Sequence, residues 1–274
     1  MTGAIDIDHL SGWIGREETA EDIVTPGLLH RFRATLGAWL TEDDGHAPLG
    51  MHWCLSPPAV PGGDLGPDGH PARGGFLPPV PYPNRMWAGG SVTFHAPLSA
   101  GDMVRRRSHI SAITPRQGRS GPLVFVSVDH DFRVKNQRRI SERQDIVYRP
   151  AGPPPPAPSP GAAAKDAFVA NPVMLFRYSA MTFNGHRIHY DHPYVTGTEG
   201  YAGLVVHGPL QATLLFHAAA RALGTTALHI TYRGLSPLIA GQPAQIRRRD
   251  GRLWLEKPDG QASFEAHAGP IPSQ

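Results

Sequence analysis

Hydrophobic residues recur with helical spacing in two parts of the chain. In residues 208–224, leucine and alanine side chains lie three or four positions apart, with Pro209 near the start and Gly224 at the end. Proline in the first turn and glycine just past the last turn are preferred helix ends. Residues 25–37 show the same arrangement around Pro26. The pattern therefore predicts one helix in each half of the chain.

Alternating hydrophobic and polar residues follow both helices, as is typical of strands with one buried face. The predicted strands are residues 123–132 and 140–148 in the first half and residues 228–232, 245–249 and 253–256 in the second half. A helix followed by several such strands predicts a helix packed on a bent antiparallel sheet. We expect this α+β arrangement twice.

A longer pattern occurs once in each half. Residues 92–107 and residues 230–249 both read as a strand, a Pro-Leu-x-Ala-Gly turn and a second strand that carries three consecutive arginines, with a short insertion in the second copy. Three matching pieces in one order favour two copies of one fold over a chance likeness of two hairpins. The arginine triplets are interpreted as solvated strand ends, because the net charge of +3 is too small for a nucleic-acid-binding protein.

A proline-rich segment lies between the two copies. Residues 151–165 read AGPPPPAPSPGAAAK, and proline lacks the amide hydrogen that helices and central strands require. The sequence therefore predicts an N-terminal unit (1–150), an extended linker (151–166) and a C-terminal unit (167–274). Residues 56–83 are also rich in proline and glycine and are expected to form a long, partly mobile surface loop.

The composition excludes several classes of protein. The chain has 274 residues, of which 40% are hydrophobic, so it can bury a sizeable core. Cys54 is the one cysteine, which rules out a disulfide framework and a cysteine-based zinc site. There is no apolar run of about 20 residues and no secretion signal at the N-terminus. We expect a cytoplasmic protein with no membrane and no nucleic-acid partner.

The chemically reactive residues are concentrated between residues 176 and 210. This segment contains four histidines, two acids and an asparagine: His186, His189, His192, His207, Asp191, Glu199 and Asn184. A metal site is one interpretation, but the spacing fits no standard zinc or iron pattern. A solvated loop without function is a second interpretation. We expect no metal and no other cofactor.

The third interpretation is a resemblance to a known family. The segment resembles the signature of the MaoC-like, or hydratase-2, family of hotdog-fold enoyl-thioester hydratases. The family motif Asp-x-Asn-Pro-x-His-x-Asp aligns with residues 184–191, and its later His-Gly aligns with residues 207–208. The resemblance covers nearly the whole chain, with a degenerate, FAS1-like dehydratase half first. It implies a double hotdog, two units that each wrap a curved antiparallel sheet around a central helix, as a monomeric pseudo-dimer or a homodimer.

The resemblance also implies a reaction. It is strongest to the subgroup that hydrates mesaconyl-C4-CoA (3-methylfumaryl-CoA), so we expect hydration of a short, branched, dicarboxylic enoyl-CoA, with citramalyl-CoA as the product. The acyl-CoA thioester is then the partner of the protein. The alternatives are a 3-hydroxyacyl-thioester dehydratase acting on CoA or carrier protein, an itaconyl-CoA hydratase, a hotdog thioesterase and a catalytically silent acyl-CoA-binding subunit.

The resemblance assigns catalytic roles to three residues. His189 matches the family's catalytic histidine, and Asp191 or Glu199 could orient it. Asn184 occupies the position of the family's aspartate, and an amide can hold a water molecule but cannot take its proton at neutral pH. Gly208, at the start of the second predicted helix, is expected to offer its N–H to the thioester oxygen.

Further residues are candidates for substrate binding. A guanidinium binds a carboxylate through two parallel hydrogen bonds, so Arg187, with Arg85 or Arg177, is a candidate for the distal carboxylate. Contacts with solvent or with CoA phosphates are the alternative for each arginine. The remaining candidates, His186, His207 and Tyr178, are expected to line the substrate site.

Overall fold

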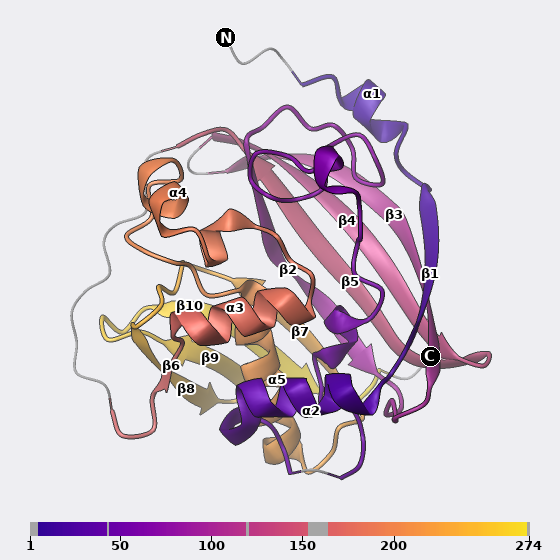
Figure 1. Ribbon diagram of the computed structural model, residues 1–274, viewed down its shortest axis with the longest axis vertical. Helices are drawn as coiled ribbons and strands as arrows, with labels where there is room; N and C mark the ends of the chain where they lie inside the picture. The colour runs from indigo at the N-terminus through magenta and orange to yellow at the C-terminus, as the bar shows by residue number, and fades with distance from the viewer. Residues whose placement is uncertain (1–4, 43, 119–120, 153–163, 273–274) are drawn as a thin grey trace.

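The computed structural model describes residues 5–42, 44–118, 121–152 and 164–272 of the chain (Figure 1). Most of the predicted linker, residues 153–163, lies outside the described residues. The strands form one antiparallel sheet in the order β1-β3-β4-β5-β2-β7-β10-β9-β8-β6. Their bounds are β1 (Glu17–Ile23), β2 (Asn84–Phe94), β3 (Met103–Gly118), β4 (Gly121–Val134), β5 (Gln137–Arg149), β6 (Phe168–Val169), β7 (Leu228–Gly234), β8 (Pro243–Arg249), β9 (Arg252–Glu256) and β10 (Ala262–Gly269).

The strand order has an internal symmetry. Outward from the centre, the first half runs β2-β5-β4-β3-β1 and the second half runs β7-β10-β9-β8-β6, so each half repeats the other's connectivity. The two halves join where β2 and β7 pair, with Ser91 opposite Thr231. Each of these residues stands six positions before the proline of its Pro-Leu-x-Ala-Gly turn. The duplication predicted from sequence is therefore present. The sequence comparison needed a short insertion in the second copy, but β2 and β7 of the structure match position by position without one.

Three of the helices are long and two are short. The longest is α5 (Gly208–Leu223), and α2 (Pro26–Leu36) lies beside α3 (Pro172–Met181), with α1 (Ile7–Ser11) and α4 (His192–Gly197) as short flanking helices. Single turns of 3-10 helix are η1 (Gly37–Trp39), η2 (Met51–Cys54), η3 (Gly62–Asp64) and η4 (Arg187–His189). Both helices predicted from sequence are confirmed, including the side-chain cap of Thr25 on α2 and the left-handed Gly224 after α5.

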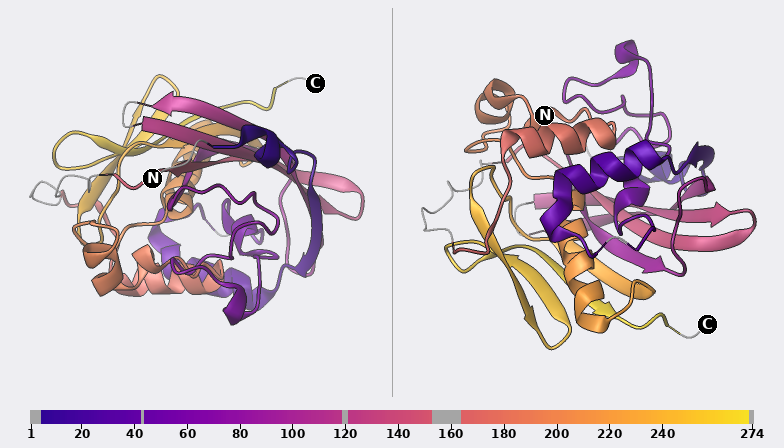
Figure 2. Two further views of the ribbon diagram at one scale, coloured as in Figure 1. Left: turned by 90° about the horizontal axis from the view of Figure 1, so that it is seen from above. Right: turned by 60° about the horizontal axis from the view of Figure 1, so that its bottom comes forward.

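The curved sheet holds α2, α3 and α5 on its concave side (Figure 2). Helix α5 packs against β7, β9 and β10, and residues such as Leu214 and Phe216 are completely buried. The first half has a smaller second core, in which Val80 and Tyr82 of the long loop cover β3, β4 and β5. Helix α2 packs on α3 instead of running through the middle of its own half. The two units of the double hotdog therefore differ in what fills them.

The arginine triplets are paired on the sheet. Arg105, Arg106 and Arg107 on β3 form ion pairs with three glutamates of β1. On β8, Arg247 is paired with Glu256 of β9. The exposed Arg105, Arg107 and Arg247 agree with the interpretation of the triplets as solvated strand ends, but that interpretation is wrong for Arg106, whose side chain is only 13% exposed. Within the described part of the chain, no helix has the length and apolar character needed to span a membrane.

Candidate active site

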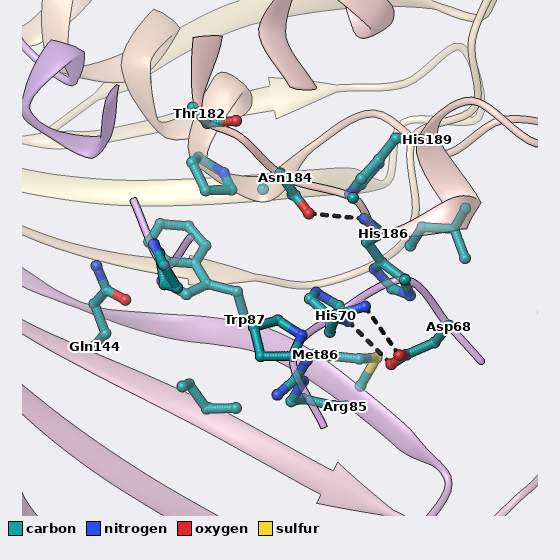
Figure 3. A pocket seen from close by; sticks show the side chains of 18 of the residues that line it. Asp68, His70, Arg85, Met86, Trp87, Gln144, Thr182, Asn184, His186 and His189 are labelled. Carbon is teal, nitrogen blue, oxygen red and sulfur yellow. Dashed lines mark hydrogen bonds and ion pairs between the residues drawn. The ribbon is translucent and has the colours of Figure 1, made fainter. Parts of the chain in front are cut away.

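A cavity of about 1810 Å³ lies between the two halves. Its wall includes the catalytic motif of the second half, the start of α5, strand β2 and the proline- and glycine-rich loop of the first half. Figure 3 shows side chains from both halves pointing toward one another across it. The site is therefore shared between the two halves.

His189 is held in the cavity wall by a main-chain group. It ends η4, is 6% exposed, and its Nδ1 donates a hydrogen bond to the carbonyl oxygen of Val205 at 2.7 Å. Burial lowers the pKa of His189 to about 4, so the ring is neutral near pH 7. With the proton fixed on Nδ1, the free lone pair is on Nε2, which suits this residue to accept a proton.

The predicted acids do not orient this histidine. Asp191 caps α4 through the N–H of Tyr194 and is paired with Arg187, while Glu199 accepts a hydrogen bond from the Tyr194 hydroxyl. The expectation that Asp191 or Glu199 holds His189 is corrected, because the carbonyl of Val205 does so.

At the start of α5, Gly208 lines the cavity, whereas His207, which was expected to line it, is not part of the cavity wall and packs against His189. His207 precedes the helix, is fully buried, stacks on His189 at 3.6 Å between ring centroids, and bonds through Nε2 to Ser179 at 2.8 Å. Burial holds the pKa of His207 well below its usual range. Gly208 is the first residue of α5, so its N–H has no acceptor within the helix.

Gly208 also needs to be glycine for steric reasons. A Cβ at this position would lie 2.9 Å from Cε3 of Trp87. Trp87 in turn stacks on Tyr232 of β7 at 4.8 Å. The absent side chain therefore leaves the N–H next to a flat aromatic surface, where a planar thioester group could lie.

A buried carboxylate, that of Glu142, holds two aromatic side chains near the cavity, Trp53 and Tyr232. Glu142 accepts hydrogen bonds from Nε1 of Trp53 at 2.9 Å and from the hydroxyl of Tyr232 at 2.7 Å, and lies 3.3 Å from His52. Burial alone raises the pKa of Glu142, but the hydrogen bonds and nearby histidines lower it to about 2. Glu142 is therefore ionised and ties the first half to β7.

Asn184 makes local contacts that leave one group free. Its Oδ1 accepts a hydrogen bond from the backbone N–H of His186 at 3.0 Å, as drawn in Figure 3. Its own backbone N–H donates to the carbonyl of Ser179. The side-chain NH2 is the part of Asn184 that remains to hold a water molecule in the cavity.

A second polar cluster comes from the loop of the first half, which the sequence did not single out. Nδ1 of His70 is hydrogen-bonded to Oδ2 of Asp68 at 3.0 Å, and the His70 ring lies 4.1 Å from the ring of His186. Burial and the nearby His70, His189 and Arg85 depress the pKa of His186. The one signal for this cluster in the sequence is a reactive Asp-Gly-His within a turn-rich stretch.

Of the three candidate arginines, Arg85 lines the cavity, and Arg187 and Arg177 do not. Arg85 and the buried Tyr178 line the cavity. Arg187 does not, because its guanidinium pairs with Asp191 at 2.8 Å and donates to the carbonyl of Pro67. The expectation that Arg187 binds the substrate is therefore not supported by its position. Arg177 is exposed on α3 and does not line the cavity.

A metal ion has one conceivable location among the described residues. Ligand atoms of Asp68, His70 and His186 lie within 4.8 Å of one another. Arg85 acts electrostatically on all three of them, and its positive charge opposes a bound cation. Both oxygens of Asp68 already accept hydrogen bonds from His70. We therefore do not assign this cluster to a metal.

Comparison with known proteins gives the class to which this fold and site belong. Residues 50–240 match the family model described as hydroxyacyl-thioester dehydratase type 2. The chain belongs to this family, and its reaction class is that of a hydro-lyase. The resemblance to hydratase-2 enzymes predicted from sequence is confirmed.

A curated relative and two solved structures are similar to this chain. It is 44% identical over 268 residues to mesaconyl-C(4)-CoA hydratase of Chloroflexus aurantiacus, covering 93% of this chain and 95% of the relative. HtdX of Mycobacterium tuberculosis superposes with a TM-score of 0.69 at 19% identity, covering 93% of this chain and all of that one. A second M. tuberculosis protein, described as a double hotdog fold, gives a TM-score of 0.51 at 14% identity, with 93% and 95% covered. The double hotdog fold is thus confirmed.

Proposed function

We propose that the protein hydrates mesaconyl-C4-CoA to citramalyl-CoA. The observation that carries this proposal is that the Nε2 side of His189 and the N–H of Gly208 border one cavity beside the Trp87 ring. Hydration of a thioester-conjugated double bond needs a base for water and a donor for the enolate oxygen. The similarity to the mesaconyl-C(4)-CoA hydratase of Chloroflexus aurantiacus supports the choice of substrate.

In the first step of the proposed reaction, the carbonyl oxygen of the thioester accepts a hydrogen bond from the N–H of Gly208. Asn184 holds a water molecule through its side-chain NH2, and Nε2 of His189 removes one proton from that water. As the water oxygen bonds to the β-carbon, the electrons of the double bond move into an enolate, whose oxygen Gly208 stabilises. His189 then returns the proton to the α-carbon, so that one water molecule is added in total. The stacked His207 and the hydrogen bond to Val205 keep His189 in position.

One assay separates this function from its alternatives. The purified protein is mixed with mesaconyl-C4-CoA, and the absorbance of the conjugated thioester and the product mass are followed together. Hydration predicts loss of this absorbance and a product heavier by one water, with no free thiol. Release of free CoA thiol would indicate a thioesterase, and binding without turnover would indicate a silent acyl-CoA-binding subunit.

Two further parts of the proposal concern the protein as a whole. We place it in the cytoplasm. We expect a monomeric pseudo-dimer or a homodimer, since the paired halves already form one continuous sheet. Light scattering at several protein concentrations tests the number of chains.

The one cysteine is buried. Burial raises the pKa of Cys54 to about 12, and Cys54 forms no disulfide within the described residues.

A further inference from the structure

Arg85 is a cavity arginine without a carboxylate partner. Among the described residues it forms no ion pair, whereas Arg106, also in the cavity wall, is paired with Glu18. Its electrostatic neighbours are Asp68, His70, His186 and the Tyr148 hydroxyl. A half-buried guanidinium that lacks a counter-ion next to a large cavity is suited to bind an anion.

Asp68 does not neutralise Arg85 because His70 occupies it. Oδ1 of Asp68 accepts the backbone N–H of His70 at 3.1 Å, and Oδ2 is hydrogen-bonded to Nδ1 of the same residue at 3.0 Å. Both carboxylate oxygens are therefore turned toward His70. Figure 3 shows the two dashed contacts of this pair, with Arg85 beside it.

The distance along β2 fits a short acyl chain. Arg85 and Trp87 are two residues apart on the same strand, so their side chains project from the same face about 7 Å apart. Trp87 lies against Gly208, where we place the thioester group. A carboxylate on the β-carbon of a substrate bound there extends toward the guanidinium of Arg85.

The loop that carries Asp68 and His70 is fixed to the catalytic motif. A Cβ on Gly69, whose φ is +86°, would lie 2.0 Å from the carbonyl oxygen of Gly185, and a Cβ on Gly185 would lie 2.6 Å from that of Gly69. The N–H of Arg187 donates to the carbonyl of Asp68 at 2.9 Å. These close backbone contacts, which only glycine permits, define where the Asp68–His70 pair sits.

We propose that Arg85, kept free of Asp68 by His70, forms a carboxylate subsite that selects acyl-CoA substrates with a free carboxylate on the β-carbon. This inference rests on the proposed hydratase function and deepens it by naming the group that recognises the substrate. Arg85 is then a specificity-determining residue and takes no part in proton transfer.

The test compares two substrates that differ in this group alone. Mesaconyl-C4-CoA has a methyl and a carboxylate on its β-carbon, and 3-methylcrotonyl-CoA has two methyls there. Wild-type protein is expected to favour the first in kcat/KM. Arg85→Met should lower that preference by roughly 10- to 100-fold, chiefly through a higher KM for mesaconyl-C4-CoA, because a charge-assisted bidentate contact is lost. The fall on 3-methylcrotonyl-CoA should be much smaller.

Two variants accompany this test. Arg85→Lys keeps the positive charge and should retain part of the preference, which also covers the case in which Arg85→Met does not fold. Arg177→Met removes an exposed arginine of α3 and should leave the preference unchanged. Equal losses on both substrates in Arg85→Met and Arg85→Lys would overturn the subsite while the hydratase function stands.

The remaining outcomes separate the two proposals. Wild-type protein that hydrates both thioesters equally well overturns the subsite and leaves a hydratase. Wild-type protein that hydrates neither overturns the proposed function, and the subsite with it. Activity that disappears on dialysis against EDTA and returns with Zn²⁺ would assign Asp68 and His70 to a metal and overturn the role given to Arg85.

The loop contact has its own matched pair of variants. Gly69→Ala should lower the preference for the dicarboxylic substrate, because the added Cβ forces the Asp68–His70 turn away from Gly185. Gly74→Ala adds the same side chain to the same loop at a similar φ of +92°, but its nearest contact is Pro79 at 3.8 Å. A preference that is equally unchanged in both variants would contradict the role of the loop.

Discussion

In both halves of the molecule, the segment that precedes the central strand, β2 or β7, forms the same backbone hydrogen bond to the Pro-Leu-x-Ala-Gly turn. In the first half the N–H of Ala47 donates to the carbonyl of Leu98, and in the second half the N–H of Val206 donates to the carbonyl of Leu238, both at 2.8 Å. These residues occupy matching positions, because each acceptor is the leucine of a Pro-Leu-x-Ala-Gly turn. The halves therefore make the same backbone contact here, although the second half places η4 and α4 between α3 and Val206, and the first half places η1 between α2 and Ala47.

They differ in the segment that follows. The second half continues into the 16-residue α5, whereas the first half makes the four-residue η2 and then leaves the sheet as a long loop. Helix α5 fills the concave side of its own strands, while the first half leaves room for the cavity. The duplicated strands therefore supply the framework. The active site comes from the segment of the second half that carries Asn184 and His189, together with the difference between α5 and η2.

The largest expected effect is the loss of the catalytic histidine of the second half. His189→Ala should lower kcat on mesaconyl-C4-CoA about 100- to 10,000-fold with the fold intact, because the group that removes the proton from water is lost. Steady-state kinetics and circular dichroism measure the two quantities. His192→Ala, which changes an exposed histidine directly after the motif, is the control. Full activity in His189→Ala would assign the chemistry to another residue.

A smaller loss is expected where α5 begins. Gly208→Ala places a Cβ 2.9 Å from Trp87, so the aromatic surface and the thioester oxygen can no longer approach the N–H together. We expect kcat to fall roughly 10- to 100-fold. Gly197→Ala, which meets nothing within 4 Å, should be neutral. Unchanged kcat in Gly208→Ala would mean that the oxyanion is stabilised elsewhere.

Buried histidines in both halves should make stability depend on pH. Burial lowers the pKa values of His130 in the first half and of His189 and His217 in the second half to about 4. The unfolded chain, with histidine pKa values near 6.5, then binds protons first, so stability is lost as the pH falls from 6.5 toward 4. Each group should cost about 2 kcal/mol between pH 7 and pH 5.

Urea unfolding at pH 7 and pH 5 measures this loss. His130→Asn should remove about 2 kcal/mol from the difference between the two pH values, because asparagine does not titrate. His192→Asn, at an exposed position, should leave the difference unchanged. A free energy of unfolding that is equal or higher at pH 5 would contradict the depressed pKa values.

The smallest effects should come from exposed arginines of the two triplets. Arg105 on β3 and Arg247 on β8 form ion pairs with Glu21 and Glu256 at positions open to solvent. Exposed pairs contribute less than about 1 kcal/mol. Arg105→Gln and Arg247→Gln should therefore each change the free energy of unfolding by less than that, and added salt should shrink the change. A loss above about 2 kcal/mol from either variant would show that its ion pair contributes more than an exposed pair does.

Local signals in the sequence determined the elements of the fold. Helical spacing closed by proline and glycine defined α2 and α5, and the Pro-Leu-x-Ala-Gly turns revealed the duplication, because these features depend on residues a few positions apart. The motif of residues 184–191 and the pair His207-Gly208 located the second half's side of the candidate site. The boundaries predicted for the two units and their linker remain predictions.

Only the tertiary structure decided how the two halves share the site. Asp68 and His70 reach the cavity from a loop that lies about a hundred residues before the motif, so no local pattern relates them to it. Arg85 was one of three candidate arginines in the sequence, and the structure alone distinguished it from Arg187 and Arg177. The same holds for Val205, whose carbonyl orients His189 in place of a predicted acid. Sequence periodicity records which residues are buried, whereas partners across the sheet are set by chain packing, and that packing placed Arg187 against Asp191 and outside the cavity.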